Sequence, residues 1–398
     1  MRTRHRALAA SLLVLALGAT SVTPAVAAAP QPASGASVSG VPAPRLRLPA
    51  PSGPYAVGES TLHLRDAGRA DPYVPEAGAR ELLVSVFYPA RGGSGVRAPY
   101  MSAKEAELLL ESRGLGGVVA PGVVGAAETY ARTGAAPAPG RFPLVVLSPG
   151  FGQSRFTLTA LATDLASRGY VVAAVDHAHE SVATVFPGGR VLPCAACEYV
   201  ERVGDAGLAE VARGRAEDVS FLLDRLTDGH PAWRHASMID RRRIGMAGHS
   251  IGGDSAASTM AADRRVRAGV NMDGTFYDPV PVAGLRGRPF MMLGTEVDHA
   301  SGGTFDTTWD RDWARLDGWK RWLTVAGAGH FTFTDLPLLA AQLGIADPSA
   351  PLPADRSGDI TRDYVAAFFD LHLKGVPQRL LAGPTPRNPE VTFQAPGR

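Results

Sequence analysis

Short apolar runs alternate with helix-competent segments from about residue 142 to the C-terminus. The runs have the length of strands, and turn residues bound them. This alternation predicts an α/β fold with a mostly parallel central sheet and helices on both faces. Strands are expected at residues 143–147, 170–175, 243–247, 266–272, 289–293 and 320–325, and helices at 156–168, 213–226, 252–262 and 361–373.

Before residue 142 the pattern is less regular. Residues 82–88 form an apolar strand closed by Pro89, and residues 61–65 are a candidate antiparallel partner. Residues 102–135 hold two helix-like segments around a turn rich in glycine and valine. These residues could pack on the domain or form a lid, and residues 186–210 are a second candidate lid.

The N-terminus has the organisation of a targeting segment. Arg2, Arg4 and Arg6 precede an apolar run over residues 7–19, and small residues follow as far as Ala27. This is the pattern of a secretory signal peptide over residues 1–27, cleaved after Ala27. The alternative, a membrane anchor, is disfavoured because the run is too short to cross about 30 Å of hydrocarbon. We therefore expect a secreted, extracellular protein without a stable membrane span.

Composition divides the remaining chain. Residues 28–54 are mostly Ala, Pro, Ser and Gly, which predicts a disordered linker, and residues 55–398 then form one domain with the α/β fold. Removal of residues 1–27 takes away three arginines and no acid, so the formal charge changes from +2 to −1. The basic pI of the whole chain therefore does not indicate a nucleic-acid partner, and we predict a monomer.

A serine stands where one of the apolar runs ends. Gly248-His249-Ser250-Ile251-Gly252 fits G-x-S-x-G, the nucleophile elbow of the α/β-hydrolase fold. Glycines two residues before and after the serine leave room for a tight strand-to-helix turn. The helix that follows directs its free N–H groups and positive dipole end toward the serine, where negative charge develops. Ser250 is therefore the candidate nucleophile.

A serine hydroxyl needs a base and an acid that orients the base. His330 follows the apolar run 320–325, at the position expected for the catalytic histidine, whereas His249 is expected to point away and pack under the turn. Asp273 and Asp298 both follow apolar runs and compete as the acid. Spacing alone does not decide between them, although the general fold favours a position like that of Asp298.

Three motifs together support a family resemblance. Gly248–Gly253, Asn271-Met272-Asp273-Gly274 and Gly329-His330-Phe331 resemble the platelet-activating-factor acetylhydrolase-like branch of the α/β-hydrolases, which includes secreted actinobacterial lipases and esterases. The resemblance spans about residues 55–393 and implies Asp273 as the acid, with Asp298 as the alternative.

The same resemblance identifies the loop Ser148-Pro149-Gly150-Phe151-Gly152. It implies an oxyanion hole made of the backbone N–H groups of Phe151 and Ile251. Many relatives have a histidine where this chain has Pro149. The implied activity is serine carboxylic ester hydrolysis of small-molecule esters, with short-acyl phospholipid, triglyceride or polyester substrates and no cofactor.

Two clusters could have other roles. Cys194 and Cys197 favour a local disulfide in an exported chain, with free thiols or a zinc site shared with nearby His177 and His179 as alternatives. We predict no metal site. Three aspartates near residue 310 could attract calcium but lack an EF-hand pattern; they are Asp306, Asp310 and Asp312.

Two other functions remain open at this point. A serine peptidase on the same fold would use the same three residues, but it would usually carry a propeller or a large cap, for which this chain has no room. A non-catalytic binding protein with a hydrolase fold is disfavoured because every catalytic position is filled.

Overall fold

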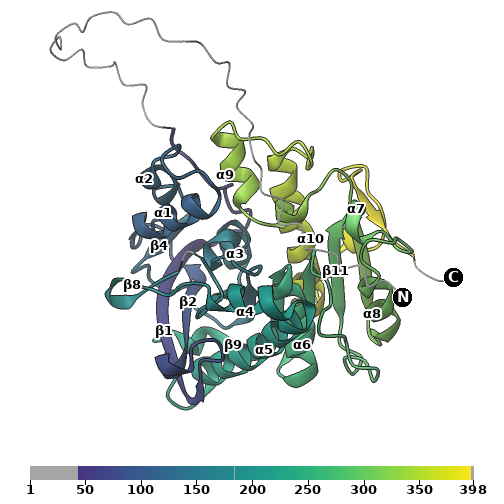
Figure 1. Cartoon of the computed structure of the whole chain (residues 1–398), viewed down its shortest axis with the longest axis horizontal. Coiled ribbons are helices and arrows are strands. Elements are labelled where there is room, and N and C mark those ends of the chain that lie inside the picture. Colours follow the sequence, from purple (N-terminus) through teal and green to yellow (C-terminus); the bar gives the residue numbers. More distant parts are fainter. Residues whose placement is uncertain (1–43, 183, 396–398) are drawn as a thin grey trace, which may run out of the picture. The chain divides into compact units, whose positions relative to one another are not determined.

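A mixed sheet runs through the centre of the computed structural model, which describes residues 44–182 and 184–395. Its strands lie in the order β13-β12-β11-β10-β9-β5-β6-β2-β1-β4-β3 (Figure 1). The parallel part comprises β6 (Val171–His177), β5 (Phe142–Ser148), β9 (Ile239–His249), β10 (Val266–Met272), β11 (Phe290–Thr295) and β12 (Lys320–Val325). This arrangement is the predicted α/β fold.

Shorter or antiparallel strands extend both edges of this sheet. On one side β2 (Ala79–Ala90) pairs antiparallel with β6 and with β1 (Ala56–Ala70). Beyond β1 lie β4 (Ala131–Thr133) and β3 (Val96–Arg97), and β13 (Val391–Phe393) closes the opposite edge. A separate two-stranded sheet joins β7 (Val185–Phe186) to β8 (Arg190–Val191). The predicted antiparallel pairing of residues 61–65 with the strand at residues 82–88 is thus confirmed.

Helices bury both faces of the parallel strands. All seven residues of β5 are buried, and alternate residues enter two different cores. Leu144 shares a core with α5 (Asp205–Thr227) and α6 (Ile251–Ala262), whereas Val145 faces α3 (Thr159–Ser167) and α10 (Ala354–Lys374). The chemistry therefore has to lie at the strand ends, because both faces are covered.

Residues 44–54 correct the predicted start of the folded domain. Leu46 and Leu48 are buried, and the main chain around them bonds to Glu128. These leucines alternate with Arg45 and Arg47, so the segment has a half-buried extended pattern that the Ala/Pro/Ser composition obscured. The predicted signal peptide, and the linker as far as residue 43, lie outside the described residues.

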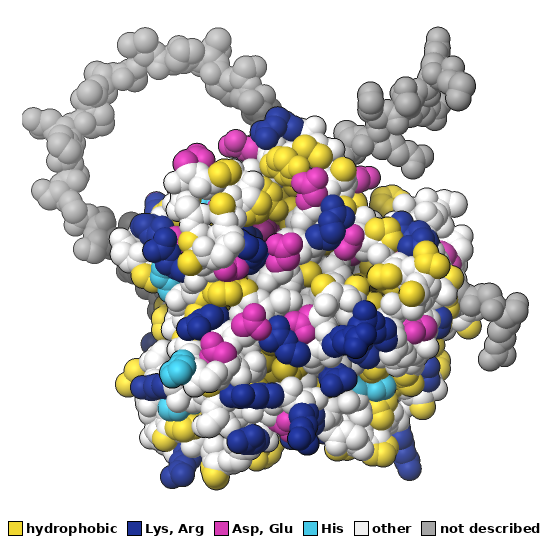
Figure 2. Space-filling model, turned by 90° about the horizontal axis from the view of Figure 1, so that it is seen from below, with side chains coloured by type: hydrophobic (Ala, Val, Ile, Leu, Met, Phe, Trp, Pro, Cys, Tyr) yellow, Lys and Arg dark blue, Asp and Glu magenta, His cyan; other side chains and the backbone are white. Residues whose placement is uncertain are grey.

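Residues 102–135 pack against this segment and form a separate small core. It includes buried side chains of α1 (Ala103–Ser112) and α2 (Pro121–Gly125), together with α9 (Leu336–Gln342). Residues 195–203 form α4 (Ala195–Val203), which packs on α5. Near the C-terminal strands lie the short helices α7 (Glu296–His299) and α8 (Thr308–Arg315). On the face that Figure 2 shows, basic side chains are interspersed with acidic and hydrophobic ones.

A search of the described residues for membrane spans gave a negative result: none of their helices combines the length and the apolar character that crossing a bilayer requires.

We predict that Leu48→Ala lowers the free energy of unfolding by about 2–5 kcal/mol, because the side chain is buried and its loss leaves a cavity. Urea unfolding of the protein measures this difference. Val282→Ala is the control, because its side chain is 85% exposed, and it should change stability by no more than about 0.5 kcal/mol. Equal stability of the two variants would contradict the packing of residues 44–54.

Candidate active site

The elbow at Ser250 is made by main chains that approach each other closely. Ser250 has φ 54° and ψ −128°, which is rare for a residue with a side chain. A Cβ on Gly248 would lie 2.1 Å from the backbone of Gly252, and one on Gly252 would lie 2.1 Å from the carbonyl oxygen of Ser148. Ser250 also donates its N–H to Met272 O at 2.8 Å. Only glycine fits at the two flanking positions, so the G-x-S-x-G pattern has a steric cause.

The structure brings Ser250, His330 and Asp273 together in one hydrogen-bonded row. Ser250 Oγ lies 3.0 Å from His330 Nε2, and His330 Nδ1 lies 2.7 Å from Asp273 Oδ2. Asp273 follows β10 directly, and His330 begins a single helical turn (His330–Phe333) after β12. The His330 side chain is 44% exposed, so a substrate can reach the face that it shares with Ser250.

Asp273 is a buried carboxylate held from several sides. Its Oδ1 accepts the backbone N–H of Thr295 at 2.6 Å and lies 3.3 Å from His299 Nε2. Burial raises the pKa of Asp273, but the hydrogen bond to His330, the His299 and His330 imidazoles and the Thr295 N–H together lower it to about 2. The carboxylate therefore stays ionised near neutral pH and can stabilise an imidazolium.

Opposing effects act on the His330 imidazole. Burial lowers its pKa, but the hydrogen bond to Asp273, the charge of Asp273 and the more distant charge of Asp298 outweigh burial and raise the pKa above its ordinary value. A stronger base results, which suits proton transfer from a serine hydroxyl.

Asp298, the alternative acid, has a different role. It lies on α7 (Glu296–His299), and its Oδ2 accepts a hydrogen bond from Thr295 Oγ1 at 3.0 Å. Because Asp273 holds His330 Nδ1, the geometry selects Asp273, the residue implied by the family resemblance, as the histidine's partner.

His249 does not point away from the site as expected. Its ring lies 4.7 Å from the His330 ring, and its Nε2 donates to the His330 carbonyl oxygen at 2.6 Å. Burial first, and then the neighbouring His330, lower the pKa of His249 to about 3. The neutral ring thus supports the main chain of the candidate base, and sequence reasoning missed this contact because no local pattern signals it.

Both predicted oxyanion donors are available. Ile251 is the first residue of α6, where backbone N–H groups lack helical partners. Phe151 lies in the turn between Gly150 and Gly152, and within the described ranges neither N–H has a protein acceptor. A Cβ on Gly150 would lie 2.8 Å from His249 Nδ1, so this loop also needs a glycine.

An apolar cluster adjoins the oxyanion residues. Ile251 and Phe151 belong to it together with Tyr73 and Tyr277, and its remaining members are Val200, Leu208, Val211 and Ala212. Tyr73 also lines a pocket of about 390 Å³, with Tyr199 on the same pocket wall. Ser250 is not among the residues that line this pocket, so the cluster, rather than the pocket itself, borders the nucleophile.

The cysteines and aspartates outside the triad are engaged within the protein. Cys194 and Cys197 form a disulfide, the state favoured over free thiols and zinc. Asp306 accepts hydrogen bonds from Thr275 and Thr308, and Asp312 pairs with Arg311. Across residues 44–182 and 184–395, these aspartates form no group that could hold a metal ion.

The fold and this row of side chains define a serine hydrolase of the α/β-hydrolase class. The family described as platelet-activating factor acetylhydrolase, isoform II, matches residues 41–187 and 224–346. The chain belongs to that family and is a carboxylic ester hydrolase. The family resemblance seen in the sequence is thereby confirmed.

Several known proteins are similar to the chain. A ferulic acid esterase from Streptomyces cinnamoneus has a structure with a TM-score of 0.77 and 44% identity, covering 88% of this chain and 99% of that one. A "Probable 1-alkyl-2-acetylglycerophosphocholine esterase" of Arthroderma benhamiae is 28% identical over 87% of this chain and 93% of its own length. The platelet-activating factor acetylhydrolase of Gallus gallus is 23% identical over 82% and 84% of the two chains.

We predict that Asp273→Asn lowers turnover by about 10⁴, because the amide leaves His330 in the wrong tautomer. Asp298→Asn should lower it no more than about tenfold, since Asp298 does not hold the ring. Turnover of one soluble ester by both variants, with circular dichroism as the folding control, measures this. The reverse ranking would assign the acid to Asp298.

Asp273→Asn should also change the pH dependence of kcat/KM. A base works only when neutral, so kcat/KM falls as the pH drops through the pKa of His330, which Asp273 raises. Without that carboxylate, the acidic limb of the residual activity should move to lower pH. A limb that stays in place in Asp273→Asn would contradict the coupling.

Proposed function

We propose that this enzyme is a secreted serine esterase that cleaves apolar or short-acyl lipid esters through an acyl-enzyme. The observation that carries the proposal is the continuous row from Ser250 Oγ through His330 to Asp273, with 3.0 Å and 2.7 Å between successive atoms. The fungal relative's name, which includes an acetylated glycerophosphocholine, supports a short acyl group. Export rests on the N-terminal pattern of the sequence alone.

The reaction follows from the geometry. His330 Nε2 takes the Ser250 proton as Oγ attacks the ester carbonyl carbon, and the Asp273 carboxylate stabilises the imidazolium. The carbonyl oxygen becomes an oxyanion, which accepts hydrogen bonds from the N–H groups of Phe151 and Ile251; each such donor contributes about 3–4 kcal/mol. His330 then protonates the leaving alcohol. In deacylation His330 takes a proton from water as the water attacks the acyl carbonyl carbon. It then returns that proton to Ser250 Oγ as the acyl C–O bond breaks and the carboxylic acid leaves.

A specific observation favours a second substrate class. The Streptomyces ferulic acid esterase shares 44% identity over 88% of this chain, more than the fungal relative. The tyrosines Tyr73 and Tyr277 in the cluster beside Phe151 and Ile251 provide aromatic surface that a phenolic acyl group could contact. Esters of hydroxycinnamic acids are therefore the alternative to short-acyl lipids.

One substrate panel separates these classes. It contains p-nitrophenyl esters of increasing chain length, 2-acetyl glycerophosphocholine, methyl ferulate and peptide p-nitroanilides. Preference for the acetyl lipid supports the lead proposal, and preference for methyl ferulate supports the alternative. Amide turnover would identify a peptidase, and absence of all turnover would identify a non-catalytic hydrolase-fold protein.

We predict that Ser250→Ala lowers ester turnover by about 10⁶, because the substitution removes the hydroxyl that forms the acyl-enzyme. Ser258→Ala is the matched control: Ser258 lies on the same helix, and its hydroxyl donates to Asp278 at 2.6 Å. The control should keep most activity. A Ser250→Ala variant with a tenth of the original turnover would exclude Ser250 as the nucleophile.

We also predict that the protein recovered from the culture medium of an expressing bacterium begins near Ala28. Signal peptidase would remove the arginine-led apolar segment over residues 1–27. Intact-mass measurement gives the start directly. Membrane-bound protein that retains residues 1–27 would show that the apolar run is an anchor.

A further inference from the structure

Five charged side chains are buried together behind the oxyanion loop, residues 148–152. Arg80 Nη1 lies 2.9 Å from Asp71 and its Nη2 lies 2.8 Å from Asp218, while Arg215 Nε lies 2.7 Å from Glu180. All five side chains are no more than 2% exposed. Burying ions is unfavourable unless each is paired, and such clusters often serve specificity rather than stability. The position of this cluster therefore calls for a functional explanation.

The Arg215–Glu180 ion pair connects to both ends of the oxyanion loop. Arg215 Nη1 donates to the Pro149 carbonyl oxygen at 2.5 Å and to Ser148 Oγ at 3.1 Å. At the other end, the Glu180 carbonyl oxygen accepts the Gly152 N–H at 3.0 Å. Only Gly150 and Phe151 lie between these anchors, so the Arg215 side chain and the Glu180 main chain together restrict the direction of the Phe151 N–H. The ion pair links the two anchors to each other.

A hydrogen-bond relay holds the start of the loop from a second side. Ser148 Oγ lies 3.1 Å from His177 Nε2, and His177 Nδ1 lies 2.8 Å from Asp218 Oδ2. Burial first, and then the charge of Arg215, lower the pKa of His177, so the ring is neutral. A neutral ring that donates from Nδ1 to the Asp218 carboxylate must accept from the Ser148 hydroxyl at Nε2.

Three side chains of this network, one histidine and two carboxylates, are of types that could in principle bind a metal ion. His177, Glu180 and Asp218 place ligand atoms within 4.8 Å of one another. However, Arg80 contacts both carboxylates and Arg215 contacts Glu180, so a cation would lie against two guanidinium groups. Arg69 Nη2 also lies 2.6 Å from Asp218, so three arginines balance the three carboxylates, and the cluster is an ion-pair network and not a metal site.

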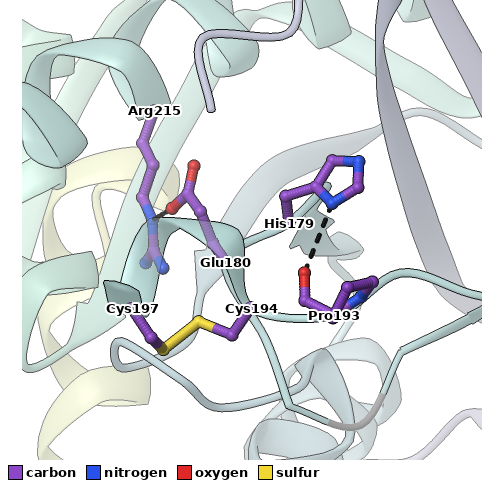
Figure 3. Close-up of a disulfide and its surroundings, with 6 residues drawn as sticks. All are labelled: His179, Glu180, Pro193, Cys194, Cys197 and Arg215. Carbon is purple, nitrogen blue, oxygen red and sulfur yellow. Dashed lines mark hydrogen bonds and ion pairs between the residues drawn. A yellow bond between two sulfur atoms is a disulfide. The ribbon is translucent and has the colours of Figure 1, made fainter. Parts of the chain in front are cut away.

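The disulfide supports the turn that carries Glu180 (Figure 3). Ala196, between Cys194 and Cys197, donates its N–H to the His179 carbonyl oxygen at 2.9 Å. His179 Nδ1 lies 3.3 Å from the Pro193 carbonyl oxygen, and His179 has φ 60°, so the turn is constrained from the side opposite Arg215.

We propose that Arg215 and Glu180 are positioning residues that orient the Phe151 N–H toward the oxyanion. This inference rests on the proposed oxyanion role of Phe151. Neither side chain touches the reacting atoms; each acts through the loop. Their loss should therefore weaken binding of the transition state more than binding of the ester, because a donor displaced by a fraction of an ångström still admits the substrate.

The test compares Arg215→Lys, Arg215→Met and Glu180→Gln in the full enzyme. Removing one oxyanion donor costs about 10²–10³ in turnover, so displacing one should lower kcat by about 10- to 300-fold, with KM within about threefold. The affinity for a phenylboronic acid, which forms a tetrahedral adduct with the serine, should fall by the same factor as kcat. Arg213→Met is the matched control, because Arg213 lies two residues before Arg215 on the same helix with its side chain 53% exposed, and it should leave kcat and boronate affinity unchanged.

The alternatives are distinguishable. The positioning role would be overturned if the folded variants kept the original kcat. It would also be overturned if KM and kcat changed in parallel while the boronate affinity stayed the same. If Arg215→Met does not fold, Arg215→Lys decides the question, because it keeps the buried charge but not the forked donor. Failure of the proposed function would instead be seen as ester turnover that survives Ser250→Ala, whatever the Arg215 variants do.

Discussion

Close contact between main chains at the end of β5 and the start of α6 is the constraint on which the site depends. Gly252 lies so near the Ser148 carbonyl that a Cβ would come within 2.1 Å of it. This contact places the oxyanion loop beside the amino end of the helix and forces Ser250 into its rare conformation. Such a geometry is unfavourable in isolation and persists because the strand β5 that leads into it is completely buried.

Buried charge then sets the chemistry on both sides of the serine. On one side, Asp273 remains ionised without exposure because the Thr295 N–H and two imidazoles neighbour it. On the other side, Arg215 donates a hydrogen bond to the Pro149 carbonyl oxygen, and the main-chain carbonyl oxygen of Glu180 accepts one from the Gly152 N–H. In each case the buried, low-dielectric environment strengthens the hydrogen bonds and ion pairs and makes an unpaired charge unfavourable. Both sets of charged groups therefore hold the neighbouring residues rigidly.

The sequence predicts what depends on local pattern. The parallel strands, the elbow and His330 follow from apolar runs and their ends, whereas the choice of Asp273 required the family resemblance because two aspartates share that context. The charge network could not be predicted: Arg80 and Asp218 are 138 residues apart, and neither has a local signature. The prediction of a linker is wrong for residues 44–54. Leu46 and Leu48 are buried there, but two leucines hardly change the composition of a segment rich in proline.

The network also explains how the loop accommodates Pro149. Proline provides no N–H, but in this loop only its carbonyl oxygen is used, as an acceptor for Arg215. Its fixed φ leaves fewer conformations for the residues that lead to Phe151. The oxyanion donor is a backbone group, so its quality depends on where the loop is held and not on the side chain before the glycine. The buried Arg215 guanidinium therefore holds the loop through the Pro149 carbonyl oxygen, together with the Ser148 hydroxyl, which bonds to both Arg215 and His177.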